Sequence, residues 1–128
     1  MNLNKFMESY AEEIGGNYSD YDEFRSVIVV PLSMDRLQAV VGEVNIDNQQ
    51  INLSSKVCMA DPKIDYKKLL MENHSTIAGK FCIANDFLKV EASFELETVS
   101  DKKLKESIQE VAQLADKWEF NITGKDVF

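Results

Sequence analysis

The residue types best suited to catalysis lie together at the single histidine of the chain, His74. Ser75 and Thr76 follow it directly, and an imidazole can act as the general base that activates a hydroxyl or a thiol. No Gly-x-Ser-x-Gly turn or other nucleophile motif accompanies these residues. Two interpretations stay open, a nucleophile–base pair and a histidine that caps a helix or faces solvent. The missing motif favours the second.

The two cysteines, Cys58 and Cys82, are the other chemically versatile side chains. They are far apart and form no CxxC pair, and zinc sites usually use close ligand pairs that these cysteines and His74 do not supply. We therefore expect free thiols, no metal and no cofactor. In the strands predicted below, the thiols lie on faces opposite Met59 and Phe81. Those faces should be partly covered, for example where two copies meet.

Acidic side chains gather at residues 12–13, at residues 20–23 and at Glu91, Glu95 and Glu97. Paired carboxylates hydrolyse glycosidic bonds inside an enclosing cleft, whereas the three glutamates fall on the polar side of an alternating strand. Residues 20–23 lack the spaced ligands and central glycine of a calcium loop. The glycine pair at 15–16 is typical of a helix end, because the pattern around it is not that of a phosphate loop. Structural or solvated roles are favoured for all of them.

The pattern of apolar residues predicts the elements that position these side chains. Helical spacing is found at residues 3–14, from 64 or 65 to 73, and at 100–120; β-branched or alternating runs predict strands at residues 26–32, 37–47, 51–59, 78–84 and 88–96. The segment before the first of these strands, residues 17–23, is predicted to be an acidic loop. A chain of 128 residues has the usual size of one domain, so we expect a single domain over residues 1–128.

Short connections between successive strands predict an α+β fold, with an antiparallel five-stranded sheet and helices mainly on one face, in the order α-βββ-α-ββ-α. On the second strand the expected core face is Val40, Gly42, Val44 and Ile46. On the third strand it is Ile51, Leu53, Val57 and Met59, with Ser55 as an interruption. The last strand alternates most regularly, which indicates one buried and one solvated face.

The short middle helix has more apolar surface than one face can bury. Leu69, Leu70 and Met71 are consecutive, so on a helix they spread over roughly 200°. We expect this helix to be covered on two sides, by its own sheet and by something else.

The charge balance excludes some partners. The chain carries 14 Lys and Arg against 22 Asp and Glu, a net charge of −8. The densest basic cluster, Lys102, Lys103 and Lys105, is flanked by acidic residues, so we expect neither nucleic-acid binding nor attachment to an anionic membrane. No signal-peptide pattern or apolar run of roughly 18 residues is present, which makes the cytoplasm the expected compartment.

Three segments together are similar to a recurring block of certain bacterial proteins. They are residues 69–73, residues 79–83 with Gly-x-Phe-x-Ile, and residues 87–92. The block resembles that of the class I type III secretion chaperones and the related YbjN-like proteins, and the closing helix at 100–120 is similar too. The resemblance implies an acidic cytoplasmic homodimer, built partly through the middle helix, with apolar patches that hold an extended polypeptide.

The function we predict is a non-enzymatic, chaperone-like module that binds protein. Dimer contact is expected at Leu69, Leu70, Met71 and Cys82. Client contact is expected at Val27 and Val29 and at an exposed sheet edge, which could accept an added strand. Two alternatives are a regulatory or stress-response domain of the YbjN-like type without a secretion client, and a small ligand-binding protein or enzyme that uses His74 and Cys82.

Overall fold

The computed structural model describes residues 1–124. Its elements are α1 (Leu3–Ile14), β1 (Asn17–Asp22), β2 (Arg25–Pro31), a 3-10 turn (Ser33–Asp35), β3 (Leu37–Asn45), β4 (Gln50–Met59), α2 (Tyr66–Glu72), β5 (Lys80–Ala84), β6 (Phe87–Glu95) and α3 (Asp101–Thr123). Within these residues no helix is both long and apolar enough to cross a membrane.

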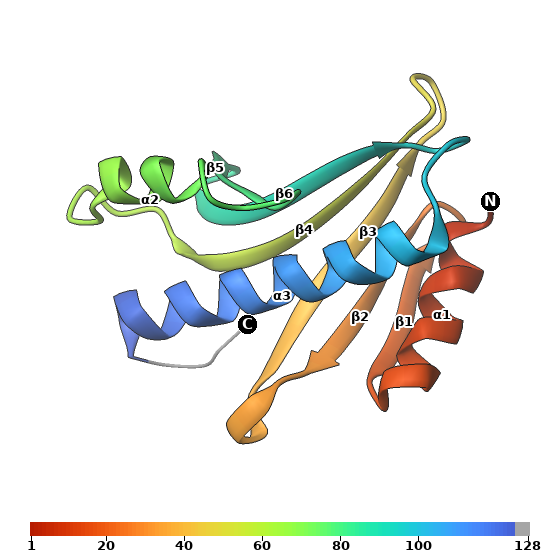
Figure 1. Cartoon of the computed structure of the whole chain (residues 1–128), viewed down its shortest axis with the longest axis horizontal. Coiled ribbons are helices and arrows are strands. Elements are labelled where there is room, and N and C mark those ends of the chain that lie inside the picture. Colours follow the sequence, from red (N-terminus) through yellow and green to blue (C-terminus); the bar gives the residue numbers. More distant parts are fainter. Residues whose placement is uncertain (125–128) are drawn as a thin grey trace.

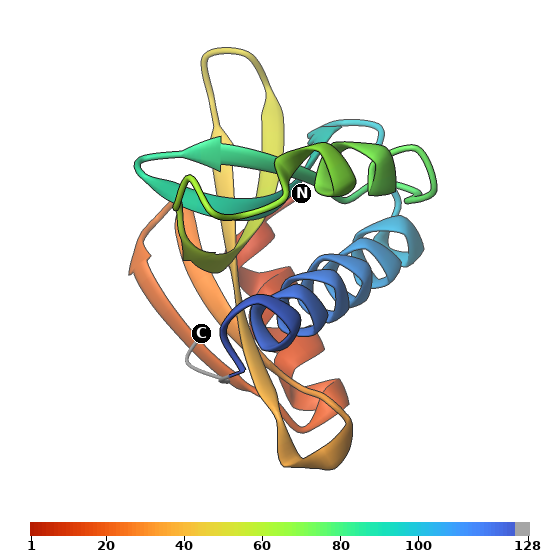
Figure 2. The same cartoon turned by 90° about the vertical axis from the view of Figure 1, so that its left-hand side faces the viewer.

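The six strands form one antiparallel sheet in the order β1-β2-β3-β4-β6-β5. Helix α1 packs on β1, β2 and β3, and α3 crosses β3, β4 and β6. Both helices lie on the same side of the sheet, and α2 lies beside β5 at the end opposite to α1 (Figures 1 and 2). The layer of α1 and α3 covers one face of the sheet, and within residues 1–124 no helix covers the other face, which we call the open face.

The prediction of an α+β fold with an antiparallel sheet is confirmed, but the predicted strand number is wrong. The segment 17–23, predicted to be a loop, contains the edge strand β1, which pairs with β2 from Asn17↔Val29 to Asp22↔Arg25. Only Tyr18 of this strand is even partly buried, so no alternation marks it in the sequence. A strand at the edge needs only backbone pairing on one side, and polar side chains suit it. The order along the chain is therefore α-ββββ-α-ββ-α.

The predicted ends of the long helices depend on capping, and the structure contains the caps. Asn2 accepts a hydrogen bond from the Lys5 N–H at 3.1 Å at the start of α1, and Ser100 does the same for Lys103 in α3. Gly15 ends α1 in the left-handed conformation, with φ of 69°. Helix α3 continues beyond the predicted end at Phe120 to Thr123.

Two strands depart from the predicted core faces. A bulge in β4 between Lys56 and Cys58 shifts the alternation, so Cys58 lies opposite Leu88 on the buried face and Met59 is exposed. The burial of Cys58 therefore comes from its own chain and needs no second copy. In β3, Val40 and Gly42 are buried as predicted, but Ile46 is exposed because it lies beyond the end of the strand.

Ser55, the polar interruption of the β4 core face, belongs to a buried hydrogen-bond network. Its hydroxyl donates to the Ala39 carbonyl at 2.6 Å and accepts from Gln38 Nε2 at 2.8 Å. The Gln38 amide also donates to the Lys56 carbonyl at 3.0 Å. Buried polar groups are tolerated where partners satisfy them, and these contacts join β3 to β4 next to the bulge.

Candidate functional site

The strongest candidate interaction surface is an apolar groove between α2 and the edge strand β5. It has a volume of about 200 Å³. Its lining residues are apolar, aromatic or thiol side chains: Tyr66, Leu69, Leu70, Phe81, Cys82, Ile83 and Leu88. We call this the α2–β5 groove. Three of the four residues predicted for dimer contact line it, and Ile83 and Tyr66 were not predicted.

Local contacts hold α2 at this position. Asp65 caps the helix by accepting from the Lys68 N–H at 3.1 Å. The Tyr66 hydroxyl accepts from the Asp61 N–H and donates to the Asp61 carbonyl, both at 2.9 Å, which folds the chain before the helix. Lys68 lies over the Trp118 ring at 5.5 Å, so α2 also contacts α3.

The three apolar residues of α2 divide between two environments. Leu69 is 2% exposed and faces the core of its own chain. Leu70 and Met71 are 64% and 65% exposed, and Ile83 across the groove is 56% exposed. The helix is thus covered on one side, and its second apolar side faces outward. Clustered apolar exposure of this kind marks an interaction site more often than scattered single residues do.

The thiols are poor nucleophiles. Burial, and then the Glu91 carboxylate, raise the pKa of Cys82 from 9.0 to about 11. Burial also raises the pKa of Cys58, with Glu119 and Asp61 adding to it. Both cysteines are free. Because the thiolate is the reactive form, the environment of Cys82 makes it an apolar lining group of the groove.

His74 lies just beyond α2, exposed to solvent and outside the α2–β5 groove. The structure describes no hydrogen bond of its imidazole to Cys82 or to Ser75 in residues 1–124. The arrangement needed for a nucleophile–base pair is not formed in the described part of the chain. No cluster of three potential metal ligands occurs among those residues either.

The predicted client residues lie on the open face of the sheet. In β2, Ser26, Ile28 and Val30 are buried under the helices, whereas Val27 and Val29 point to the other face and are half-buried. Val27 lies opposite Val41, and Val29 opposite Ala39. These four residues, Val27, Val29, Ala39 and Val41, form an aliphatic strip across β2 and β3, which we call the open-face strip.

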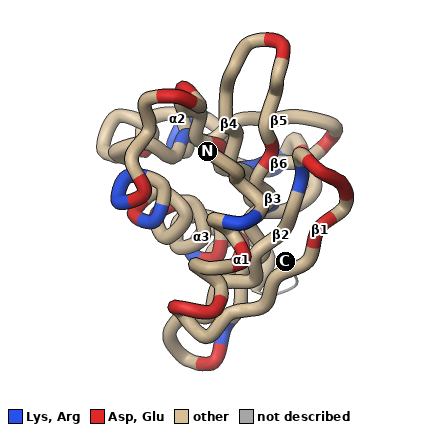
Figure 3. The backbone as a smooth tube through the Cα atoms, turned by 90° about the vertical axis from the view of Figure 1, so that its right-hand side faces the viewer, with Lys and Arg blue, Asp and Glu red and all other residues tan. Residues whose placement is uncertain are grey.

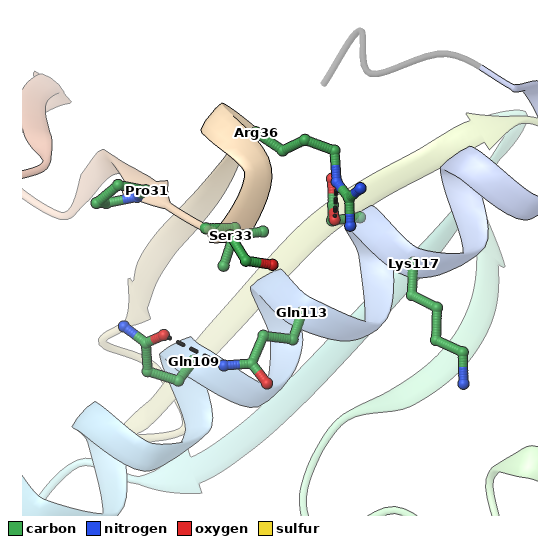
Figure 4. Close-up of a pocket in the computed structure, with 8 residues that line it drawn as sticks. Pro31, Ser33, Arg36, Gln109, Gln113 and Lys117 are labelled. Atoms are coloured by element: carbon green, nitrogen blue, oxygen red, sulfur yellow. Dashed lines mark hydrogen bonds and ion pairs between the residues drawn. The ribbon is translucent and has the colours of Figure 1, made fainter.

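A larger and more polar cavity, of about 580 Å³, lies between the β2–β3 connection and α3 (Figure 4). Arg36 Nε donates to Asp116 at 2.8 Å there, and the guanidinium lies over the Phe120 ring at 5.4 Å. Ser33 and Gln113 line the same cavity. The ion pair ties the connection to α3 and was not predicted. The sequence offered a single indication of this ion pair, Asp116 within the apolar stripe of the last helix.

Neither a protein-family model nor a curated protein sequence matches the chain. Solved structures do resemble it. A chain in the crystal structure of the ExsC–ExsE complex matches with a TM-score of 0.63 and 13% identity, over 91% of this chain and 90% of that one. A chain in the HopA1–SchA chaperone–effector complex matches with a TM-score of 0.66 and 9% identity, over 92% of this chain and 94% of that one.

At these identities the likeness establishes the fold alone. It covers about nine-tenths of the chain and supports the type III secretion chaperone-like fold that the resemblance implied. The resemblance rested on short segments between residues 69 and 92 and on the closing helix at 100–120, whereas the structural likeness extends over about nine-tenths of the chain.

Proposed function

We propose that this protein is a chaperone-like module of a single domain that pairs with a second copy through the α2–β5 groove and holds an extended polypeptide. The observation that carries the proposal is the second apolar side of α2. Leu70 and Ile83 line the groove and are exposed, Met71 adds exposed apolar surface next to Leu70, and the structure offers no covering element for them in residues 1–124.

A second copy is the occupant that this surface favours. A short helix beside an edge strand can pack against its own copy around a twofold axis, and each apolar residue then meets an equivalent surface. The groove walls contribute almost only apolar area, as expected for the core of a stable interface. Lys67 on the same helix, with Glu72 at its end, would provide a polar rim.

A client segment would lie on the open-face strip and along a sheet edge. Val27 and Val29 are only half-buried, so a chain laid over them would remove further apolar surface from water. The fold similarity to a chain of a chaperone–effector complex supports a protein client. The acidic balance of the chain keeps the proposed cytoplasmic protein soluble and favours basic or apolar segments as clients.

The dimer is tested by the mass in solution. Size exclusion with light scattering should give a dimer for the wild type and a mass that falls toward the monomer for Leu70→Glu, because the change places a charge in an apolar contact. Met34→Glu is the matched control, since Met34 is exposed in the 3-10 turn after β2, outside the groove lining, and its replacement should leave the mass unchanged. A monomeric wild type would refute the homodimer.

Client holding is tested with a permanently unfolded protein, reduced and carboxymethylated so that it cannot refold. The wild type should bind it and slow its aggregation, and the double variant Val27→Asp and Val29→Asp should bind at least about tenfold more weakly if the strip contributes 1.4 kcal/mol or more. Equal binding by wild type and variant would remove the open-face strip from the proposal. No binding by either would favour a regulatory domain without a client.

A further inference from the structure

The two edges of the sheet differ in whether their backbone groups are free. In an antiparallel pair, residues alternate between those that bond the neighbouring strand and those that point both backbone groups away from it. On β5, the Phe81 N–H donates to Asn73 Oδ1 at 2.6 Å, and the Asn73 amide donates to the Phe81 carbonyl at 3.2 Å. The backbone N–H and C=O of Phe81 therefore point away from β6. The Asn73 side-chain amide bonds both of them, as a neighbouring strand would.

The next outward position along this edge is occupied too. Gly79 lies two residues before Phe81, and its N–H donates to Glu110 Oε1 at 2.6 Å. The same carboxylate accepts from the N–H groups of Ala78 and Ile77, both at 2.8 Å. Of the outward positions of β5 and its lead-in, only Ile83 is left without such a bond in the described residues.

Both closing side chains are held in place. The Asn73 N–H donates to the Leu69 carbonyl at 3.2 Å as the cap of α2, and its own carbonyl accepts from Lys80 Nζ at 2.8 Å. Burial raises the pKa of Glu110, but the hydrogen bonds from Gly79, Ile77 and Ala78, and the Lys80 ammonium, lower it more. The carboxyl is therefore ionised at neutral pH, with a pKa below its ordinary value.

The β1 edge is arranged differently. The Val44 N–H donates to the Phe24 carbonyl at 2.8 Å, so even-numbered residues of β2 bond β3 and Val27 and Val29 bond β1. Their partners there are Ser19 and Asn17, which leaves the backbone groups of Tyr18 and Asp20 pointing outward.

No side chain within residues 1–124 bonds the outward backbone groups of β1. The Asn4 amide donates to the carbonyls of Asp22 at 2.8 Å and Glu23 at 3.2 Å. Both carbonyls lie later in the chain than the outward groups of Tyr18 and Asp20. Within the described part of the chain, the outward backbone groups of Tyr18 and Asp20 are thus unbonded, and acidic residues gather on the hairpin that carries β1 (Figure 3).

From these contacts we infer that Asn73 and Glu110 close the β5 edge to strand addition, so that an extended segment with basic residues joins the sheet at β1. The choice of β1 for a client rests on the proposed function, whereas the closure of β5 does not. An open edge accepts strands without much regard to sequence, and closure leaves the α2–β5 groove to contact its partner through side chains. Asp20, Asp22 and Glu23 supply the charge that favours lysine or arginine in the added strand.

Amide exchange in the wild-type protein tests the closure directly. At a concentration where the protein is monomeric, the Phe81 and Gly79 amides should exchange at least about tenfold more slowly than those of Ile83, Tyr18 and Asp20, relative to the unfolded chain. Fast exchange at Phe81 would overturn the closure, and it would do so whether or not the protein dimerises at higher concentration.

Addition at β1 is tested with a synthetic peptide of alternating valine and lysine. The peptide should slow exchange at Tyr18 and Asp20 and leave Ile83 unchanged, and a valine–glutamate peptide should have a weaker effect. In Asn73→Ala the valine–lysine peptide should also protect Phe81 and Ile83, because the β5 edge is then open from Phe81 to Ile83 while Glu110 still bonds Gly79. Thr76→Ala is the matched control, since it disturbs the same corner and leaves the edge closed.

The outcomes separate the two claims. Protection at Ile83 in the wild type, or no added protection at Phe81 in a folded Asn73→Ala protein, overturns the closure. Absence of protection at β1 overturns the choice of edge and leaves the dimer through the groove to be judged by its mass. If Asn73→Ala does not fold, the wild-type exchange rates alone decide the closure.

Discussion

The two ends of the sheet use opposite means to present a surface. At the β5 end, α2 and the strand offer apolar side chains while two polar side chains occupy the backbone. At the β1 end, the side chains are mostly polar, and within residues 1–124 no side chain bonds the outward backbone groups of Tyr18 and Asp20. Apolar surface is readily recognised in a sequence, whereas a free row of backbone groups leaves no residue pattern. Conspicuous apolar side chains and an available strand edge therefore lie at opposite ends of the sheet.

The largest effect should separate the two sides of α2. Leu69→Ala removes a buried side chain at the β5 end and should lower the free energy of unfolding by about 3 kcal/mol, through lost burial and the cavity that remains. Leu70→Ala on the same helix should change it by less than about 0.5 kcal/mol in the monomer, because that side chain is already exposed. Urea unfolding of dilute protein measures both.

A substitution at the β1 end serves as the reference for Leu69→Ala and Leu70→Ala. Tyr21→Ala removes a large exposed side chain whose only described ring contact is with Arg25, at 5.3 Å, and should cost less than about 1 kcal/mol. If Leu69→Ala costs no more than Tyr21→Ala, then α2 is not packed into the core, and the contrast between the ends fails.

The second effect concerns pH and should appear at the β5 end alone. Glu110→Gln replaces an ionised acceptor of three N–H groups with a neutral one, and should cost about 1–2 kcal/mol near neutral pH. The pKa of Glu110 is lowered in the folded state. Its contribution is therefore complete above the ordinary value of 4.5 and is lost as the pH falls through the folded value.

Thermal or urea unfolding across this range measures the difference between wild type and Glu110→Gln. The difference should be constant near neutral pH and narrow below about pH 4.5. The β1 hairpin is held to α1 by the Asn4 amide, which does not titrate, so Asn4→Ala should lower stability by the same amount at every pH. A gap between wild type and Glu110→Gln that widens in acid would contradict the assigned hydrogen bonds.

The features of the fold that depend on burial could be predicted from the sequence, whereas most features that depend on hydrogen bonds to the backbone could not. The helices, five of the strands and the apolar surplus at Leu70 follow from periodicity and caps. Strand β1 could not be predicted, since Tyr18 is its only partly buried side chain and pairing with β2 defines it. The bulge that turns Cys58 inward, and the edge closure by Asn73 and Glu110, depend on contacts between residues distant in the chain. Asn73 was visible only as the end of a helix.

The rate at which Cys82 is alkylated reports on the α2–β5 groove without a mutation in the groove. A shift of the Cys82 pKa from 9.0 to about 11 lowers its thiolate fraction about 100-fold near pH 8. Because a thiolate of higher pKa is also more nucleophilic, iodoacetamide should react at least about tenfold more slowly than with the unfolded chain. Cys58→Ala removes the other thiol from the assay.

Should two copies meet at the α2–β5 groove, the rate at Cys82 would fall further as the protein concentration rises and would become independent of concentration in Leu70→Glu. A rate close to that of the unfolded chain would mean that β5 and α2 do not enclose the thiol, and the apolar end of the comparison would lose its basis.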